Sequence, residues 1–537
     1  KGYENLLLQS NSFTTSPWSQ SGTTITSGQS GYDGSSDAWE IGRDGGSGLA
    51  FINQVISATA LQTFSIYAKA NTEDWIFLQV AATGGGAGYF DLANGTSGST
   101  SGIDSSIDSI GDGWYRIQIV FNSTTSGSIR IFVASANGNL TTTGSIYIQD
   151  AMLNQGLVAY PYIETTTAPV AGGILEDMPR LDWSGSCPAL LLEPSRTNLL
   201  DNSEYLSAIS GVQLSNLSLS YTATTSPENV GNAHKLIVSN VTNSPTRLFV
   251  QTQGSGSQVV SVFAKAGEVN SIAVSSYDGI AYLWAAYNLT NGSFISATAD
   301  EYGIEDYGNG WYRVWVYVAN STNRYAQISI GDSADIIVNG FFRTDGNGSD
   351  GLYLYGWQVE QDATYPTSYI PTYGVSQTRL ADSVTDAGDV NTFNSTEGVL
   401  YAEMSALAND GTYRLIDISG VSSGDRIFLA YTNSDNRIRV VLRVANIAQF
   451  DYQYTLNDAT EFNKIAFKYK ENDFSLWVNG TKVYTDSSGI TFPLDTLNVI
   501  NFSNAFGSEK LFGKIKQVLY FPTALSDSEC IALTTIT

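Results

Sequence analysis

A stretch of six residues occurs twice in this chain and indicates that a whole domain is duplicated. Gly111-Asp-Gly-Trp-Tyr-Arg116 returns as Gly308-Asn-Gly-Trp-Tyr-Arg313, and alternating apolar residues follow both copies. Asn5-Leu-Leu likewise returns as Asn198-Leu-Leu. The displacement is roughly 195 residues, whereas solenoid and propeller repeats recur roughly every 20–50. The repeating unit is therefore a domain. A duplicated domain favours binding or assembly over catalysis, because one catalytic centre rarely needs a second copy.

The composition is typical of strands joined by polar turns. The chain has 537 residues, enough for about three domains, and Ser, Thr, Gly, Asn, Val, Ile and Tyr dominate it. Segments such as 64–69 and 114–121 alternate apolar and polar residues, as strands with one buried and one solvated face do. The sequence therefore predicts an all-β chain in which the two copies are tandem jelly-roll β-sandwich modules.

Changes in this pattern suggest the domain boundaries. The first jelly-roll module is predicted over residues 1–164 and the second over 198–372. Prolines interrupt residues 165–197, which we interpret as an extended connector whose apolar segment 189–192 packs against a neighbouring domain. The third domain is predicted over 373–537.

Within this third domain the alternation of apolar residues predicts six strands, at 398–404, 426–431, 437–444, 464–469, 474–480 and 514–521. One short helix is expected over 526–534. Ser526 is its predicted N-cap, and Glu529 completes a capping box three residues later. The third domain is therefore also expected to be a β-sandwich.

The charge balance argues against several classes of partner. Lys and Arg number 26 against 51 Asp and Glu, a net charge of −25. A surface this acidic repels phosphate backbones and anionic membranes, so we expect no nucleic acid partner. No run of about 18 apolar residues is present, so we expect no membrane insertion. Cys187 and Cys530 lack the spacing of a disulfide framework or a zinc site and are expected to be unpaired thiols.

The chain offers little from which to build acid–base catalysis. Its single histidine, His234, precedes an apolar strand-like segment and has no Ser or Cys nucleophile motif beside it, so we expect a turn or strand-edge residue. Glycoside hydrolysis needs two carboxylates across a cleft, and the acidic residues here are spread through turns. We predict no catalytic residues and a protein that is not an enzyme. A polysaccharide hydrolase or lyase on this scaffold is the open alternative.

Aromatic side chains outside the obvious core predict contact with glycans. Sugar C–H faces pack on aromatic planes, while amides and carboxylates hydrogen-bond the hydroxyl groups. In the second module the expected carbohydrate-binding residues are Tyr277, Tyr282, Trp284, Tyr287, Asp278 and Asn288. In the first module they are Trp39 and Trp75. Trp284 is the preferred stacking platform because indole has the largest flat apolar face, although strand alternation buries about half of any such set.

Two further tryptophans are assigned to the core. Trp114 and Trp311 each open a strand after a Gly-x-Gly turn, and each is followed by an arginine, Arg116 or Arg313, that we expect to face solvent. The two indole rings should therefore be buried at equivalent places in the two modules.

Bound calcium is a further expectation, because jelly rolls often hold their loops with an oxygen-lined ion. The sequence has no EF-hand pattern, and the metal ligands stay unassigned. The candidates are Asp37, Asp150, Glu204 and Glu360.

The landmarks of the two modules together resemble a known group. Asn-Leu-Leu, the Ala-Lys-Ala strand, Gly-x-Gly-Trp-Tyr-Arg and the closing segments 351–360 and 365–372 look like jelly-roll carbohydrate-binding-type modules of bacteriophage fibres and related virion surface proteins. Residues 179–200 are similar to the segment that precedes this module in many phage structural proteins. The first copy departs from the pattern, because Asp150-Ala-Met-Leu-Asn-Gln155 replaces Gly356-Trp-Gln-Val-Glu-Gln361. A binding property carried over from the family is therefore less secure in the first copy.

The third domain resembles concanavalin A-like (laminin G-like) lectin sandwiches. The resemblance rests on residues 474–483 and 513–529. It completes the expected fold class, which is two tandem jelly-roll modules followed by a concanavalin A-like β-sandwich.

The resemblance implies a virion surface fibre or spike protein that attaches to host or environmental glycans. Its partners would be glycans, other virion proteins and further copies of itself in a homo-oligomer, with a trimer as one option. A secreted bacterial adhesin, or the binding appendage of a carbohydrate-active enzyme, is the alternative. A structural decoration protein without a ligand is a further alternative.

Overall fold

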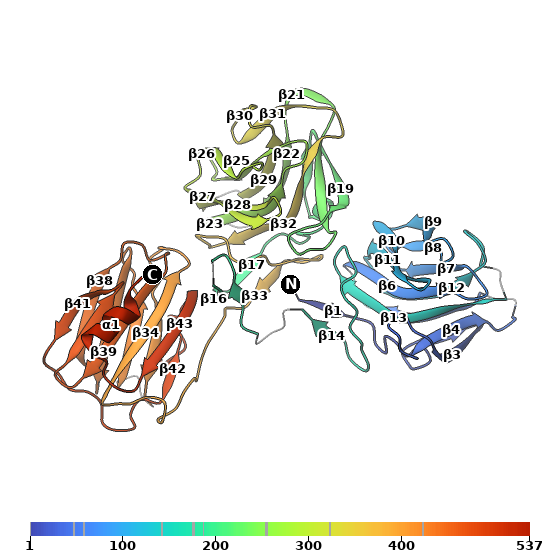
Figure 1. Ribbon diagram of the computed structural model, residues 1–537. Coiled ribbons are helices and arrows are strands. Elements are labelled where there is room, and N and C mark those ends of the chain that lie inside the picture. Colours follow the sequence, from blue (N-terminus) through green and yellow to red (C-terminus); the bar gives the residue numbers. More distant parts are fainter. Residues whose placement is uncertain are drawn as a thin grey trace. The chain divides into compact units, whose positions relative to one another are not determined.

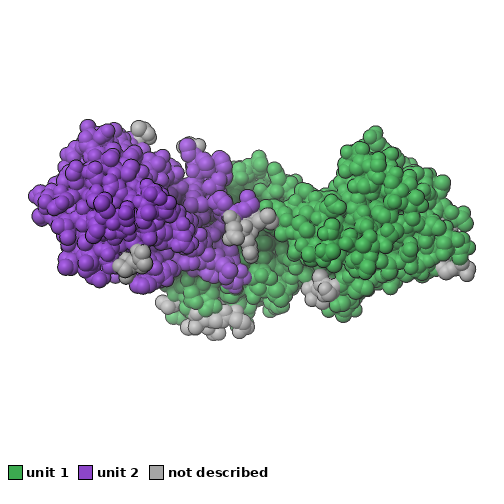
Figure 2. Space-filling view, turned by 90° about the horizontal axis from the view of Figure 1, so that it is seen from below, with its two compact units in different colours: residues 1–176, 197–377 green, residues 177–196, 378–537 purple. Residues whose placement is uncertain are grey.

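The computed structural model describes residues 2–46, 49–56, 60–140, 143–173, 178–185, 187–252, 256–321, 324–420 and 424–536. The chain is 54% strand and 2% helix, which confirms the all-β fold class. It divides into two compact units, shown in different colours in Figure 2. Unit 1 comprises residues 1–176 and 197–377, and unit 2 comprises 177–196 and 378–537.

The first copy of the repeat is a sandwich of two six-stranded antiparallel sheets (blue to cyan in Figure 1). One sheet has the order β10 (Asp104–Gly111), β11 (Trp114–Asn122), β6 (Leu61–Ala70), β13 (Ser145–Gln155), β4 (Ala38–Arg43) and β3 (Thr23–Gln29). The other has the order β2 (Ser19–Ser21), β5 (Phe51–Ile56), β12 (Gly127–Ala134), β7 (Trp75–Ala81), β8 (Ala87–Asp91) and β9 (Thr96–Ser101). Alternate apolar side chains of the two sheets meet in one buried core.

The second copy has the same topology with different strands. Its first sheet has the order β27 (Glu301–Gly308), β28 (Trp311–Ser321), β23 (Gly256–Lys265), β32 (Gly351–Gln361), β20 (Ala233–Val238) and β19 (Leu217–Thr224). Its second sheet has the order β18 (Gln213–Ser215), β22 (Arg247–Thr252), β29 (Arg324–Gly331), β24 (Ser271–Tyr277), β25 (Tyr282–Asn288) and β26 (Ser293–Ala297). Each strand therefore has a counterpart at the same place in the first copy, as the duplicated landmarks predict.

The second copy carries one addition. A three-stranded sheet of β21 (Val241–Pro245), β31 (Phe341–Gly346) and β30 (Ile336–Val338) lies beside its second sheet. Unit 1 also has short elements, which are β1 (Tyr3–Asn5) paired with β14 (Val170–Gly172) and the 3-10 turn η1 (Leu206–Ala208). The short strands β17 (Arg196–Asn198) and β33 (Gln377–Arg379) each cross the boundary between the units in sequence.

The repeated tryptophans are buried, as predicted. Trp114 and Trp311 are each 2% exposed, and each lies opposite a lysine of the neighbouring strand, Lys69 or Lys265. They do not lie in the core between the sheets. They lie on the outer side of the first sheet, where tyrosines such as Tyr32 and Tyr355 join the same clusters.

The arginines that follow these tryptophans correct one prediction. Arg313 is 3% exposed and does not face solvent. Its Nη2 donates to the Ser261 hydroxyl at 3.0 Å and to the Thr367 carbonyl at 2.7 Å. Arg116 makes the same two types of contact, to Ser65 and Tyr160. Both arginines therefore hold the closing segment of their copy on the outer side of the first sheet.

Unit 2 is a concanavalin A-like sandwich of a seven-stranded and a five-stranded sheet. The seven-stranded sheet has the order β15 (Leu181–Asp182), β16 (Ala189–Leu192), β43 (Gly513–Phe521), β34 (Glu397–Ala406), β39 (Asn463–Lys470), β40 (Phe474–Val478) and β41 (Thr481–Asp486). The five-stranded sheet has the order β38 (Ile447–Thr455), β37 (Arg437–Val444), β36 (Arg426–Tyr431), β35 (Arg414–Ser419) and β42 (Val499–Asn501). All six strands predicted for this part of the chain are present.

The predicted helix is also confirmed. Helix α1 (Asp527–Thr534) begins after Ser526, and the side chains of Ser526 and Glu529 form the predicted capping box. The helix packs on the outer side of the seven-stranded sheet, where the buried thiol of Cys530 meets Tyr401 and Trp477. Cys187 is exposed.

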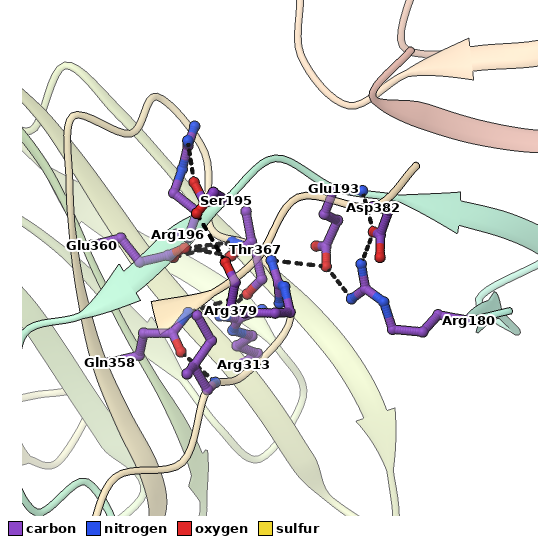
Figure 3. Close-up of polar contacts among 11 residues, drawn as sticks. Arg180, Glu193, Ser195, Arg196, Arg313, Gln358, Glu360, Thr367, Arg379 and Asp382 are labelled. Carbon is purple, nitrogen blue, oxygen red and sulfur yellow. Dashed lines mark hydrogen bonds and ion pairs between the residues drawn. The ribbon is translucent and has the colours of Figure 1, made fainter. Parts of the chain in front are cut away.

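Residues 177–196 contribute two strands to unit 2. In β16, Leu190 pairs with Ile515 of β43, and Leu192 joins the core between the two sheets. Arg180 forms ion pairs with Glu193 and Asp382, and Arg379 lies 3.2 Å from Glu193 (Figure 3). The segment predicted to be a connector is therefore partly an integral piece of a sheet. The domain boundaries expected from the sequence stay a prediction.

Candidate functional site

Strand alternation places a set of aromatic rings on the outer face of the second copy's second sheet. In β22 and β24, residues such as Leu248, Val250 and Val274 point into the core, so their neighbours point the opposite way. The half-buried rings on this outer side are Phe249, Tyr277, Tyr282 and Tyr325, and Phe341 of β31 joins them. We refer to these five rings as the second aromatic face.

An arginine lies among these rings. The guanidinium carbon of Arg247 is 3.8 Å from the ring centre of Phe249 and 5.1 Å from that of Phe341. Its Nε donates to Gln327 at 2.6 Å and its Nη2 to the Tyr282 hydroxyl at 3.1 Å. Cation–π contact and two hydrogen bonds therefore fix the guanidinium plane among flat apolar surfaces.

The rings contact one another in a continuous series. Ring centres are 5.0 Å apart for Tyr277 and Tyr282, 6.0 Å for Tyr277 and Tyr325, and 6.4 Å for Phe249 and Tyr325. The Tyr282 and Phe341 centres are 5.2 Å apart. This arrangement combines apolar planes with donors and acceptors, which are the two kinds of group that a sugar ring needs.

The equivalent face of the first copy has the same kind of composition. Its rings are Phe51, Trp75, Phe77, Tyr89 and Phe132, which we call the first aromatic face. Arg130 of β12 lies 5.3 Å from the Phe51 ring centre, and its Nη1 donates to Gln79 at 3.4 Å. Both copies therefore carry an arginine, a glutamine partner and several rings on the outer side of the same sheet.

The structure separates the aromatic residues predicted for the second module. Tyr277 and Tyr282 are half-buried and belong to the second aromatic face. Trp284 is on the same side of β25 but only 8% exposed, because Phe342 and Ile337 of the added three-stranded sheet cover it. Tyr287 is 1% exposed and lies in the core between the sheets. The indole that we expected to be the stacking platform therefore has little free ring surface.

The predicted polar residues cap turns. Asp278 Oδ1 accepts hydrogen bonds from the backbone amides of Ile280 and Ala281, both at 2.7 Å. Asn288 Oδ1 accepts from the amide of Thr290 at 2.8 Å. These oxygens satisfy local backbone donors, as Asx turns do.

The two tryptophans predicted for the first module lie on different sheets. Trp75 is half-buried in the first aromatic face, with Gly98 close to its ring. Trp39 is in β4 of the opposite sheet, where its Nε1 donates to the Asn11 carbonyl at 3.0 Å and its ring packs against Phe13. The structure therefore does not bring Trp39 and Trp75 together.

The sequence analysis missed both arginines of the aromatic faces. Arg247 and Arg130 each alternate with core residues in their strands, so the alternation assigned them to the outer side. No sequence signal showed that rings from neighbouring strands would surround them, because those contacts join residues 35 or more positions apart.

The remaining candidate residues have structural partners. His234 is 1% exposed, its Nε2 lies 2.5 Å from the Glu204 carbonyl oxygen, and burial lowers its pKa to about 4. The carboxylate of Glu204 accepts hydrogen bonds from the hydroxyls of Tyr355 and Tyr373, at 3.2 and 3.1 Å. The imidazole is therefore neutral at pH 7 and enclosed within the second copy.

Glu360 is buried in the closing segment of the second copy. It accepts hydrogen bonds from the amide and the hydroxyl of Thr367, and burial raises its pKa (Figure 3). The side-chain oxygen Oε1 of Gln358, two residues earlier, accepts a hydrogen bond from the backbone amide of Ile370 at 2.7 Å. Gln358 and Glu360 therefore hold the backbone of the closing segment in place.

The calcium candidates do not converge on one site. Within the described ranges, no three His, Cys, Asp or Glu side chains gather closely enough to hold a metal ion. Asp37 accepts hydrogen bonds from Ser35 and from Gln149, and Asp150 accepts the hydroxyl of Tyr32 at 2.9 Å. Calcium stays a prediction without an assigned set of ligands.

Comparison with known proteins identifies part of unit 2. Residues 382–530 match the family model described as the concanavalin A-like lectin/glucanases superfamily. The match agrees with the two-sheet architecture and with the resemblance of residues 474–483 and 513–529. No curated protein matches the chain. Among the described residues, no helix is long and apolar enough to cross a membrane.

Several solved structures have a detectable similarity to this chain. The CBM40 of the Ruminococcus gnavus IT-sialidase, bound to α2,3 sialyllactose, is 17% identical with a TM-score of 0.24 and covers 29% of this chain and 97% of its own. The CBM22 tandem of Paenibacillus barcinonensis Xyn10C is 9% identical with a TM-score of 0.21 and covers 67% and 98%. Domains LG4-5 of the mouse laminin α1 chain are 12% identical with a TM-score of 0.21 and cover 57% and 94%.

Proposed function

We propose that this protein attaches to glycans through the two aromatic faces of unit 1 and acts as a surface component of a virion fibre or spike. The observation that carries the glycan proposal is the matched composition of the two faces. Each combines half-buried rings with an arginine that is held by a glutamine, Arg130 with Gln79 and Arg247 with Gln327. The virion setting follows from the sequence resemblance.

The chemistry of the faces suits sugar rings. Half-buried rings such as Phe77 and Tyr325 present planes to the C–H faces of a pyranose, and the fixed guanidinium donates to hydroxyl groups. One such contact is weak by itself. Two faces on one chain, and several chains on one particle, would raise the apparent affinity through effective concentration.

A glycan array on paired variants tests the proposal. Tyr277→Ala/Tyr325→Ala removes two rings from the second face, and Trp75→Ala/Phe77→Ala removes two from the first. Phe294→Ala is the matched control, because this ring is 50% exposed but packs against Tyr302 and Tyr287 away from both faces. Circular dichroism confirms that each variant is folded.

We expect each double variant to lose signals that the wild type and Phe294→Ala both give. Folded variants that keep every signal would show that the sugar site lies elsewhere. A wild-type protein that binds no glycan would support the ligand-free structural alternative.

We also expect no turnover of glycans. The one histidine is buried against a carbonyl oxygen, and the carboxylates of Glu204 and Glu360 are enclosed by donors of their own copy. Incubation with a panel of polysaccharides, followed by assays for reducing ends and unsaturated uronates, checks this expectation. Sustained product formation that stops when one carboxylate is replaced would contradict it.

A further inference from the structure

Arginines are concentrated on one sheet face of this acidic protein. In β37 the side chains of Ile438, Val440 and Leu442 point into the core of unit 2, so their neighbours point to the outer side of the five-stranded sheet. That outer side carries Arg437, Arg439 and Arg443 of β37 and Arg426 of β36, all partly exposed. We call these four residues the arginine row. Nothing in the proposed function of unit 1 uses them.

Two of the arginines lie directly opposite each other. The strand register pairs Arg426 with Arg443. Like charges at directly opposed positions of an antiparallel pair destabilise the sheet. Arg426 is partly neutralised by Asp417, whose Oδ2 is 3.3 Å from its Nη1. Among the described residues, no carboxylate lies within ion-pair distance of Arg443.

Burial disfavours the charged form of the Asp417 carboxyl. Its side chain is fully buried, and burial raises the pKa of its carboxyl to about 6. Its Oδ1 and the Nε of Arg426 are buried with no hydrogen-bond partner in the described part of the chain. One carboxylate against two guanidinium groups therefore leaves positive charge at the Arg426–Arg443 pair.

At the other end of the arginine row, Arg437 and Arg439 lie beside residues of β38. Arg439 makes two hydrogen bonds to Asp451, through Nε at 2.8 Å and Nη2 at 2.5 Å. Arg437 has no carboxylate within ion-pair distance in the described ranges, and the exposed side chains of Gln453 and Thr455 lie beside these two arginines on β38. Alternate residues of one strand are about 7 Å apart. The row thus presents spaced guanidinium groups next to neutral hydrogen-bonding side chains.

We propose that the arginine row binds an acidic polysaccharide, with Arg437 and Arg443 contacting its carboxylate or sulfate groups. The guanidinium fork matches both groups in geometry and hydrogen-bonding capacity. Spaced arginines suit a polymer with one acidic group per sugar or per few sugars. Duplex DNA carries one charge per about 1.7 Å, which would press many phosphates against Asp451 and against a chain of net charge −25.

Binding to defined polymers tests this proposal on the full chain. Isothermal titration with polygalacturonate, dextran sulfate, neutral dextran and single-stranded oligothymidylate is measured at low and at high salt. The variant Arg437→Gln/Arg443→Gln removes both positive charges and leaves shorter, polar, hydrogen-bonding side chains, and Arg443→Gln alone is the milder form. Lys470→Ala is the matched loss of one charge, because this lysine is exposed on β39 of the other sheet.

We expect polygalacturonate or dextran sulfate to bind, and salt to weaken binding by screening. The double variant should bind about tenfold more weakly or worse, the single variant should be intermediate, and Lys470→Ala should bind as the wild type does. Whichever of the two polymers binds identifies the acidic group. Tyr277→Ala/Tyr325→Ala should leave this binding unchanged, so failure here and failure of the unit 1 proposal are distinguishable.

Four results would overturn the proposal. They are wild-type protein that binds neither acidic polymer, a folded double variant that keeps full affinity, equal binding of neutral dextran, and equal or tighter binding of oligothymidylate. Circular dichroism and the thermal midpoint establish that the double variant is folded. If it is not folded, the single variant at the partly exposed Arg443 decides between retained and lost affinity.

Discussion

The side-chain amide of Asn198 donates a hydrogen bond to the carbonyl of Ile370, 172 residues away, at 2.9 Å. Its Oδ1 accepts from the amides of Leu200 and Val359, at 3.2 and 3.1 Å. Asn5 makes the corresponding contacts in the first copy, including one to the Ile163 carbonyl at 2.8 Å. One buried side chain thus joins the first strand, the last strand and the closing segment of each copy.

Asn198→Ala should destabilise the second copy by roughly 2–4 kcal/mol. The substitution leaves buried backbone donors and acceptors without partners, and each such group costs about 1–3 kcal/mol. Urea unfolding followed by tryptophan fluorescence measures the change. Asn240→Ala is the control, since this asparagine is exposed in a turn, and it should change the free energy of unfolding by less than about 0.5 kcal/mol. Equal effects of the two variants would contradict the anchoring role.

Trp311→Ala should cost about 3–5 kcal/mol and unfold the second copy before the rest of the chain. The ring is 2% exposed, and its Nε1 donates to the Thr225 carbonyl at 3.1 Å. Calorimetry should show one transition moving to lower temperature. Trp183→Ala, at a ring that is 70% exposed, should leave every transition in place. A Trp311→Ala protein with unchanged transitions would show that the ring carries little of the stability.

Trp284→Ala should act on stability before it acts on sugar binding. The indole fills the space between β25 and the added three-stranded sheet, where a Cβ on Gly340 would come within 2.9 Å of the ring. We expect a loss of roughly 3–5 kcal/mol. Chemical unfolding measures it, with Phe294→Ala as the exposed aromatic control. A fully stable Trp284→Ala protein that has lost its glycan signals would restore Trp284 as the stacking platform.

Asp150 should make the first copy less stable as pH rises. Its carboxyl is 6% exposed, and burial, with the neighbouring Asp37 and Asp33, raises its pKa to about 7. The folded state therefore holds this proton up to a higher pH than the unfolded chain, whose Asp pKa is about 3.9, so stability falls as pH rises from about 4 to 7.

Asp150→Asn should remove this dependence and stabilise the protein at pH 8 by roughly 1–3 kcal/mol. Thermal midpoints measured from pH 4 to pH 8 check it. Asp112→Asn is a matched control, because Asp112 (φ 50°) has the same left-handed backbone as Asp150 (φ 55°) but is exposed. If both variants show the wild-type pH profile, Asp150 is not the titrating group.

The duplicated landmarks predicted the equivalence of the two copies because the repeated residues make the same contacts in each copy. Asn5 and Asn198 hold the same three backbone segments, and Trp114 and Trp311 occupy the same register beside a lysine. Six strands of unit 2 and its capped helix were likewise predicted, since alternation and capping act between residues that are close in sequence.

Alternation relates the predicted sugar-binding residues of one strand to each other but does not assign them to a surface. Tyr282 and Trp284 are two positions apart and so share a side of β25, which the structure shows to be the outer side. Whether that side is exposed depends on residues 336–346, which return from elsewhere in the chain to cover Trp284 and leave Tyr282 half-buried. No pattern within β25 contains this information.

The sequence alone determined that the protein is all-β and that one module occurs twice, because periodicity and repetition encode these features locally. The resemblance of residues 474–483 and 513–529 implied the lectin-like sandwich. Only the tertiary structure showed that residues 189–192 belong to a sheet of unit 2, that Arg313 is buried against the Thr367 carbonyl, and that arginines gather beside rings in unit 1 and in a row in unit 2. These features depend on pairing between distant strands, because strand order and register decide which side chains meet, and neither is written in the residues of any one strand.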